Sequence, residues 1–490
     1  MIGNSATYRF FPDAGGSKLS PLILFLLFVT VGVYFICGQL FLPVPVLVLC
    51  IAPVVLFATF YLVNGESTML GILILVLTLI QLKSAHGEFT IYDALVGAFL
   101  VGTLFVLFIR RICVPEKYTV GSTQYILFIL YVVWVSAVGI SNLLFAKTTL
   151  EWWLRDLLLL SPLLIVPPLF LSMDLSSRRD RRIFFGVMVL NWILCFGLSI
   201  VRLRASFLEV TYLFEVSYSL INGLNGPFML IVFFNLFLAE KQKKRSRYYL
   251  IGIIISIVAV VLVHNRTFWI VTPIGLLLSV LTSEKAERRK AYRLFFRLTF
   301  FFALLGGILY LAFPLLRIML KLFIAFFLSS SNVRTDASLV GRYIEWRHIW
   351  SAIQESPIIG YGVGSTYHTY NWFGGYFYDS GYTHNGYLGV LQRGGIIGFI
   401  LLFSAYLGFI KKGWGLMRSK LLSGTDRALL RAGVAILVLL LIAMNTANLF
   451  SHRDILMYIG LIWGYILYLS KSLRSDADLH GALEHTAAHE

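Results

Sequence analysis

The chain has 490 residues, of which 58% are hydrophobic and only 13% are charged, and its mean hydropathy is +0.82. A soluble core of this length cannot use so much apolar surface, so a soluble globular class is excluded and the lipid bilayer must be the solvent. The formal net charge of +17 does not indicate a nucleic-acid partner, because the basic residues cluster between hydrophobic runs. The four cysteines lie in or beside hydrophobic runs and predict no disulfide or metal framework.

Apolar runs long enough to cross the bilayer recur along most of the sequence, and no stretch alternates like a barrel strand. They predict an all-α polytopic membrane protein, a bundle of about 12–14 transmembrane helices. The windows before the longest polar stretch are 21–41, 43–63, 68–82, 91–109, 122–145, 157–173, 183–201, 212–238, 248–264, 267–282 and 294–315. The windows after it are 385–410, 428–449 and 454–470.

The basic clusters fall in every second connection, which predicts that these connections and both termini face the cytoplasm. The expected organisation is a cytoplasmic tail at 1–20, a transmembrane bundle at 21–315, a large loop outside the cytoplasm at 316–384 where function is to be sought, further transmembrane helices at 385–470 and a cytoplasmic tail at 471–490. We expect the polar end from 475 to 490 to be disordered.

The large loop begins with a predicted amphipathic helix from Leu339 to Glu355, which Pro357 ends. Its apolar stripe predicts that it lies on the membrane face or over the bundle. Glycines at 360, 362 and 364 predict a tight turn that lets the backbone approach a ligand. The aromatic residues that follow fit either a surface that stacks on sugar rings or an interfacial belt.

Four arginines and one histidine on the outer side are candidates for chemistry. Arg342 could reach over the mouth of the bundle toward a phosphate, and Arg266 sits between two hydrophobic runs where an arginine normally pairs with an anion. Arg202 and Arg204 add positive potential on the same side. The alternative for all four is an interfacial anchor. His384, just before a predicted helix, suits a general base because the helix N-terminus favours neutral imidazole; its alternative role is a helix cap.

Carboxylates in the outer loops are scattered without a paired acidic motif, so we expect a metal-independent reaction. The order and spacing of the motifs in residues 341–398 resemble the O-antigen ligase and polysaccharide polymerase superfamily. The residues that carry this resemblance are Arg342, Trp346, Pro357, Gly360-Tyr361-Gly362-Val363-Gly364, His384-Asn385 and Gly394-Gly395-Ile396-Ile397-Gly398. Asn265-Arg266 is similar to that superfamily's Ser-Arg element, with Asn in place of Ser.

The resemblance implies a GT-C-like fold and a glycosyltransferase of the bacterial inner membrane with a periplasmic active site. It would move a glycan, with inversion, from undecaprenyl pyrophosphate to a hydroxyl of a glycan or lipid A-core acceptor, with no cofactor. His384 would activate the acceptor, and Arg266 and Arg342 would bind the pyrophosphate. Substrate-binding roles fall on Arg202, Arg204, Trp346, Gly360, Tyr361, Gly362, Gly364 and Asn385.

Ligase and polymerase remain open at this point, because they share the donor chemistry and differ in the acceptor. Membrane lipids and polysaccharide assembly proteins are the other expected partners, and nucleic acid is not. The competing function is a lipid-linked oligosaccharide flippase or another polysaccharide transporter. A transporter of that kind would be expected to show charged or broken helices at mid-membrane and internal repeats.

Overall fold

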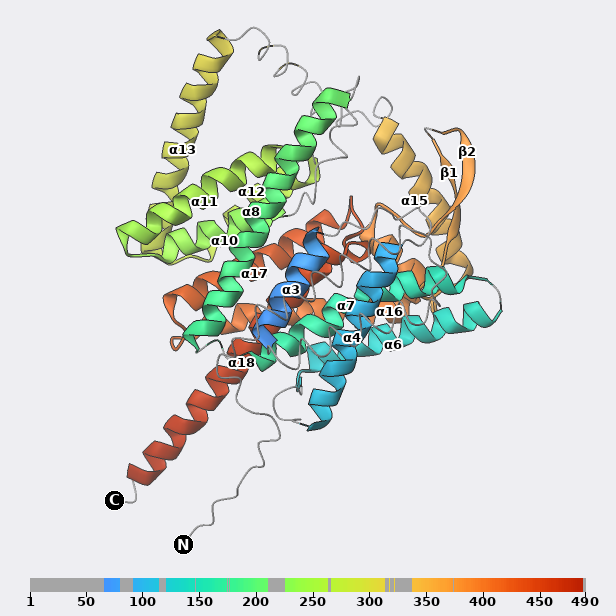
Figure 1. The fold of residues 1–490 in the computed structure, drawn as a ribbon, viewed down its shortest axis with the longest axis horizontal. Helices are drawn as coiled ribbons and strands as arrows, with labels where there is room; N and C mark the ends of the chain where they lie inside the picture. Colours follow the sequence, from blue (N-terminus) through green and yellow to red (C-terminus); the bar gives the residue numbers. More distant parts are fainter. Residues whose placement is uncertain are drawn as a thin grey trace, which may run out of the picture.

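The computed structural model describes residues 66–79, 91–113, 120–209, 225–262, 266–312, 317, 321 and 337–487, apart from residues 146, 174, 176 and 373. The part described is a helical bundle with one two-stranded hairpin (Figure 1). Its first helices are α3 (Glu66–Leu79), α4 (Ile91–Cys113), α6 (Thr123–Leu144), α7 (Leu150–Ser172) and α8 (Arg178–Glu209). The next are α10 (Asn225–Ala239), α11 (Lys243–Leu262), α12 (Arg266–Leu281) and α13 (Lys285–Ala312). Then come α15 (Ala337–Glu355), strands β1 (Tyr367–Asn371) and β2 (Tyr376–Ser380), α16 (Gly386–Leu416), α17 (Gly424–Ala443), a 3-10 turn η1 (Leu449–Ser451) and α18 (Arg453–Ala487).

The predicted fold class is confirmed, because the apolar windows within the described residues coincide with helices. Five helices there are long and apolar enough to cross a membrane, namely α6, α7, α13, α16 and the first part of α18, and shorter apolar helices lie in α3, α10 and α12. The windows 21–41 and 43–63 lie outside the described residues, so the expected number of spans stays a prediction. The chain is a multi-pass membrane protein.

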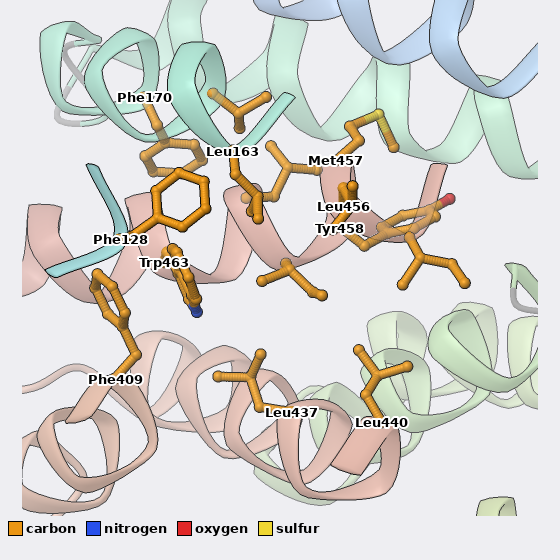
Figure 2. Packing of buried hydrophobic residues seen from close by; sticks show 14 of the residues in the cluster. Phe128, Leu163, Phe170, Phe409, Leu437, Leu440, Leu456, Met457, Tyr458 and Trp463 are labelled. Atoms are coloured by element: carbon orange, nitrogen blue, oxygen red, sulfur yellow. The ribbon is translucent and has the colours of Figure 1, made fainter. Parts of the chain in front are cut away.

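The main hydrophobic core lies where α6, α7, α16, α17 and α18 meet (Figure 2). Trp463 of α18 is fully buried at its centre. Its ring stacks on Phe409 of α16 at 4.3 Å between centroids and meets Phe128 of α6 edge-on at 5.5 Å. Aromatic pairs of this kind add about 0.5–1.5 kcal/mol to the burial of their area. Segments from both halves of the chain are therefore fixed to one another.

A second hydrophobic cluster joins α8, α10, α11, α12 and α13, which lie side by side in the upper left of Figure 1. Arg431 of α17 is only 2% exposed and connects this group to α17. Its guanidinium donates to the Asn235 side chain of α10 at 2.6 Å and to Glu287 of α13 at 2.6 Å. A buried arginine needs such partners, so α17 and α10 are held in one register.

The helix predicted at the start of the large loop is confirmed as α15, and its predicted apolar stripe is divided between two environments. Ile353 of the stripe is buried together with Ile349, whereas Tyr343 and Trp350 of the stripe are 63% and 49% exposed. The neighbours decide this, because the buried side chains pack against Tyr367 of β1 and the start of α16. The expected interfacial or sugar-binding run of aromatics is folded into the β1–β2 hairpin, at the right in Figure 1.

The C-terminal tail differs from the prediction of disorder. Helix α18 continues past the last apolar window and ends at Ala487. The sequence from 471 to 487 contains no proline and several good helix formers, so nothing in it interrupts the hydrogen bonding of the preceding span. The continuation projects from the lower left of the bundle in Figure 1.

Helix α16 is broken in its N-terminal third at Gly395, which has φ 59° and ψ −163°. The backbone N–H groups that the break leaves free are satisfied by the turn after α15. The N–H of Ile396 donates to the carbonyl of Pro357 at 2.9 Å, and the N–H of Ile397 donates to that of Ile358 at 3.3 Å. In a membrane protein such groups must find protein partners, because lipid offers none.

The carbonyls on the other side of the break are satisfied by the glycine-rich loop that follows the turn. The N–H of Tyr361 donates to the carbonyl of Gln392 at 2.9 Å, and the N–H of Gly362 donates to that of Arg393 at 2.7 Å. The segment after α15 therefore both accepts hydrogen bonds from α16 and donates hydrogen bonds to it, and in this way it completes the broken turn of α16.

Candidate active site

Helix α15 places a glutamate over the start of α16. Ile349 and Ile353 bury against Tyr367 of the hairpin and against Leu388 and Leu391 of α16. Glu345, one turn before Ile349, is carried on the same face and is only 9% exposed. A carboxylate in such a position must be hydrogen-bonded or it would cost several kcal/mol.

Glu345 meets this requirement by accepting three hydrogen bonds from the two residues before the N-cap of α16. The Thr383 hydroxyl and the backbone N–H of His384 both donate to Glu345 Oε1 at 2.6 Å. The imidazole Nδ1 of His384 lies 2.6 Å from Glu345 Oε2. Burial alone would raise the pKa of Glu345, but these hydrogen bonds and the charge of His384 outweigh it and hold the pKa below its ordinary value.

The carboxylate determines which nitrogen of His384 is available. Because ionised Glu345 only accepts hydrogen bonds, Nδ1 is the nitrogen that carries the proton in the neutral ring, and Nε2 is then the nitrogen with the lone pair. The His384 side chain is 43% exposed, and the ring of Tyr382 meets it edge-on at 5.0 Å. A carboxylate behind an imidazole fixes the ring and stabilises the imidazolium that forms when Nε2 takes a proton. A histidine in this arrangement can accept a proton at Nε2, which is the chemistry that a general base requires.

His384 stands next to the N-terminus of α16, as the sequence predicts. Asn385 is the N-cap, and its side chain accepts from the N–H of Leu388 at 3.1 Å. The expected binding of substrate by Asn385 stays a prediction. The N–H of Gly386 donates to the carbonyl of Met444 at 2.8 Å, which holds the start of α16 against the turn after α17.

The same turn holds the start of α12, where Arg266 is the first residue. The hydroxyls of Thr267 and Thr446 are 2.7 Å apart, and Thr446 follows Met444 by two residues. The N-termini of α12 and α16 are therefore joined through one short turn. Helix N-termini favour anions, so this placement suits a phosphate between them. The structure does not describe the Arg266 side chain.

Arg342 lies on α15, three residues before Glu345, and is partly buried. Among the residues that the structure describes, its guanidinium forms no ion pair, which leaves it available for an anionic ligand. Trp346 follows it by one turn and is also partly buried. Arg202 and Arg204 lie in the last turns of α8, and their side chains are not described. The structure thus places His384 and Asn385 against the turn that also holds the start of α12, and it places Arg342 on the helix whose Glu345 contacts His384.

The glycines at 360, 362 and 364 adopt positive φ values of 77°, 75° and 82°, so the predicted tight turn is confirmed. The close approach that they permit is to other parts of the protein. A Cβ at Gly360 would lie 2.4 Å from the backbone nitrogen of Gly395. A Cβ at Gly362 would lie 2.1 Å from the backbone of α6, and one at Gly364 would lie 2.6 Å from the backbone of α7. Their binding of a ligand stays a prediction, as does that of Tyr361, whose hydroxyl donates to Glu355 at 2.9 Å.

A buried ion pair beneath this loop was not predicted from the sequence. Arg393 of α16 donates to Asp156 of α7 at 3.1 Å, and the side chain of each is 9% exposed. Asp156 also accepts from the N–H of Gly364 at 3.0 Å, and Arg393 donates to the carbonyl of Gly381 at 3.0 Å. The pair therefore fixes both the glycine-rich loop and the segment that leads to His384. A charge of each sign inside hydrophobic helices was the available signal.

The segment that holds these residues is similar to a known protein family. Residues 251–403 match the family model of O-antigen ligases. The predicted resemblance is confirmed over this part of the chain. The matched segment contains Arg266, Arg342, Glu345 and His384, and its last residues lie in α16 beyond the break. None of the curated proteins compared with the chain matches it. The family supports a role in polysaccharide assembly that resembles glycosyl transfer.

Proposed function

We propose that the protein is an inverting membrane glycosyltransferase that moves a glycan from undecaprenyl pyrophosphate to an acceptor hydroxyl during assembly of a surface polysaccharide. The observation that carries the proposal is the Glu345–His384 pair at the start of α16, inside the O-antigen ligase domain. A transporter would have no evident use for a histidine that is oriented by a carboxylate and has one ring nitrogen open.

The reaction is a single displacement. The acceptor hydroxyl gives its proton to Nε2 of His384 while its oxygen forms a bond to the anomeric carbon of the donor sugar. The bond from that carbon to the pyrophosphate oxygen breaks, and the electron pair stays on the lipid pyrophosphate. Attack opposite the leaving group inverts the anomeric centre. Glu345 stabilises the imidazolium, whose proton is later released to water.

The developing charge on the pyrophosphate needs fixed positive partners. Arg342 supplies a guanidinium on the same helix as Glu345, and Arg266 supplies a second one at the start of α12. Guanidinium groups bind phosphate in bidentate fashion and stabilise charge that grows as the bond breaks. In this scheme the reaction needs no metal, the active site faces the periplasm and the protein resides in the inner membrane.

The test is reconstitution of the purified protein in liposomes with a lipid-linked donor. One arm adds a lipid A-core acceptor and another adds a second lipid-linked repeat, so that ligase and polymerase activities are separated. We expect transfer in one arm, undiminished by EDTA. The His384→Ala variant should bind the donor normally while transfer falls by about 10²- to 10⁴-fold.

The pH profile gives a second readout. Transfer by the wild type should decline as the imidazole becomes protonated, and the residual activity of His384→Ala should lack this decline. If His384→Ala transfers at nearly the normal rate with an unchanged profile, His384 is not the base. Movement of the donor across the bilayer without transfer in either arm would favour the flippase.

A further inference from the structure

The hairpin that precedes His384 has one face that is largely exposed in the described part of the chain. In the antiparallel register Tyr370 lies opposite Phe377 and His368 lies opposite Asp379, so these four side chains share a face. On the opposite face Tyr367, Thr369 and Ser380 are buried, and Tyr367 packs against Ile349 and Ile353 of α15. Phe377 is 60% exposed, although it is a large apolar residue at the centre of the open face.

The rings on this face are held in place by one another. Phe377 lies 5.3 Å from the ring of His368, nearly parallel to it, and 5.0 Å from the ring of Tyr370. The ring of His348 on α15 is also nearly parallel to Phe377, at 6.2 Å. We call this open face, formed by His368, Tyr370, Phe377 and Asp379, the platform. Because its rings are already ordered, it loses little conformational freedom when a ligand binds.

The edge of the platform is polar. His368 Nδ1 lies 3.0 Å from Asp379 Oδ1, and these side chains are 67% and 69% exposed. A hydrocarbon environment would have to desolvate this pair, so insertion of the face among lipid chains is disfavoured. A sugar matches both features, because its C–H face packs on an aromatic ring while its hydroxyls donate to a carboxylate or an imidazole.

The platform leads directly to the proposed base. The hydroxyls of Tyr367 and Ser380 both donate to the carbonyl of Tyr382, at 2.7 and 2.8 Å, and fix the chain between β2 and His384. His384 follows Phe377 by seven positions, so the two residues are at most about 23 Å apart along an extended chain. A short glycan with its hydroxyl at His384 would pass over the face.

We propose that the open face of the hairpin, formed by His368, Tyr370, Phe377 and Asp379, binds the acceptor glycan and orients its hydroxyl toward His384. The donor is held by its pyrophosphate at the arginines, so the sugars that pass beside the base on the hairpin side belong to the acceptor. This inference rests on the proposed function.

The test uses the full chain in lipid nanodiscs and the variants Phe377→Ala, Phe377→Trp and Asp379→Asn. Acceptor and donor concentrations are varied separately. We expect Phe377→Ala to raise the KM for acceptor about two- to tenfold, the loss of one stacking contact, with kcat and the KM for donor unchanged. Phe377→Trp should retain the low KM, and Asp379→Asn should raise it. Tyr248→Ala on α11 is the matched control, because Tyr248 is 61% exposed and helix α11 lies on the opposite side of the bundle from the hairpin in Figure 1.

A binding arm makes the inference independent of turnover. Fluorescently labelled oligosaccharides, released by mild acid from the surface polysaccharide of the organism that encodes the chain, are titrated into each protein. Binding that Phe377→Ala weakens and Tyr248→Ala does not supports the platform even where transfer is absent, which separates it from failure of the proposed function. Equal binding by wild type and Phe377→Ala, or a rise only in the KM for donor, overturns the proposal. So does greater access of oxygen than of water-soluble nickel to a nitroxide at Phe377→Cys, because that places the face in lipid.

Discussion

The Asp156–Arg393 pair gives the sharpest test of how the glycine-rich loop and the segment before His384 are held. Asp156→Asn keeps an acceptor for the N–H of Gly364 but leaves Arg393 as an uncompensated buried charge. Removing one partner of a buried pair costs about 3–5 kcal/mol. Both side chains here are 9% exposed, so water screens little of this loss. We expect the apparent free energy of unfolding to fall by about 3 kcal/mol, and transfer to fall as well because Arg393 also holds Gly381.

The assay is SDS-induced unfolding in mixed micelles, followed by circular dichroism. The double variant Asp156→Asn with Arg393→Gln removes both charges and should recover part of the loss, because a neutral buried pair carries no unpaired charge. Glu284→Gln is the control, since its pair with Arg427 at 2.6 Å is more exposed and worth at most about 1 kcal/mol. A loss below about 1 kcal/mol in Asp156→Asn, or full additivity in the double variant, would refute the reasoning.

Three further changes test the break in α16, the acid response and the donor site. Gly395→Ala should destabilise the protein by about 1–3 kcal/mol in the same assay, because its φ is 59° and a Cβ would lie 2.2 Å from the Ile358 carbonyl oxygen; Gly415→Ala in the same helix meets no atom within 4 Å and should not destabilise. The pKa of Glu345 in the folded protein lies below its ordinary value of 4.5, so the stability that its carboxylate contributes is complete well above pH 4.5 and is lost as pH falls through the folded pKa. The thermal unfolding temperature should therefore fall more steeply with acid in the wild type than in Glu345→Gln. Equal slopes in the two proteins would contradict this. Arg342→Ala and Arg266→Ala should each cost about 1.5–3 kcal/mol in kcat/KM for donor, with Lys restoring only part; normal kcat/KM in both Ala variants at low donor would make these arginines mere anchors.

The membrane helices could be predicted because their signal is local. A run of apolar residues is sufficient to place α6 or α12 within a few residues, and Pro357 correctly predicts the end of α15. The role of His384 as a candidate base also follows from local sequence, since the helix it precedes begins at Gly386.

The partners of these residues could not be predicted in the same way. Glu345 and His384 are 39 residues apart, and Asp156 and Arg393 are 237 apart. Nothing in the sequence alone fixes the rotation of α15 that turns Glu345 inward and Trp350 outward. That rotation depends on the hairpin, whose strands alternate aromatic and polar residues too irregularly to predict a sheet face.

The shared hydrogen bonds between α16 and the glycine-rich loop have a consequence for how the chain is made. Residues 357–362 leave the ribosome before α16 and, in the predicted topology, have crossed the membrane when α16 enters it. Helix α16 needs these residues, because its break leaves N–H and carbonyl groups that lipid cannot satisfy. The loop and the first three turns of α16 therefore have to match each other in sequence. An exchange of outer loops between relatives should succeed only when the segment around Gly395 is exchanged with them.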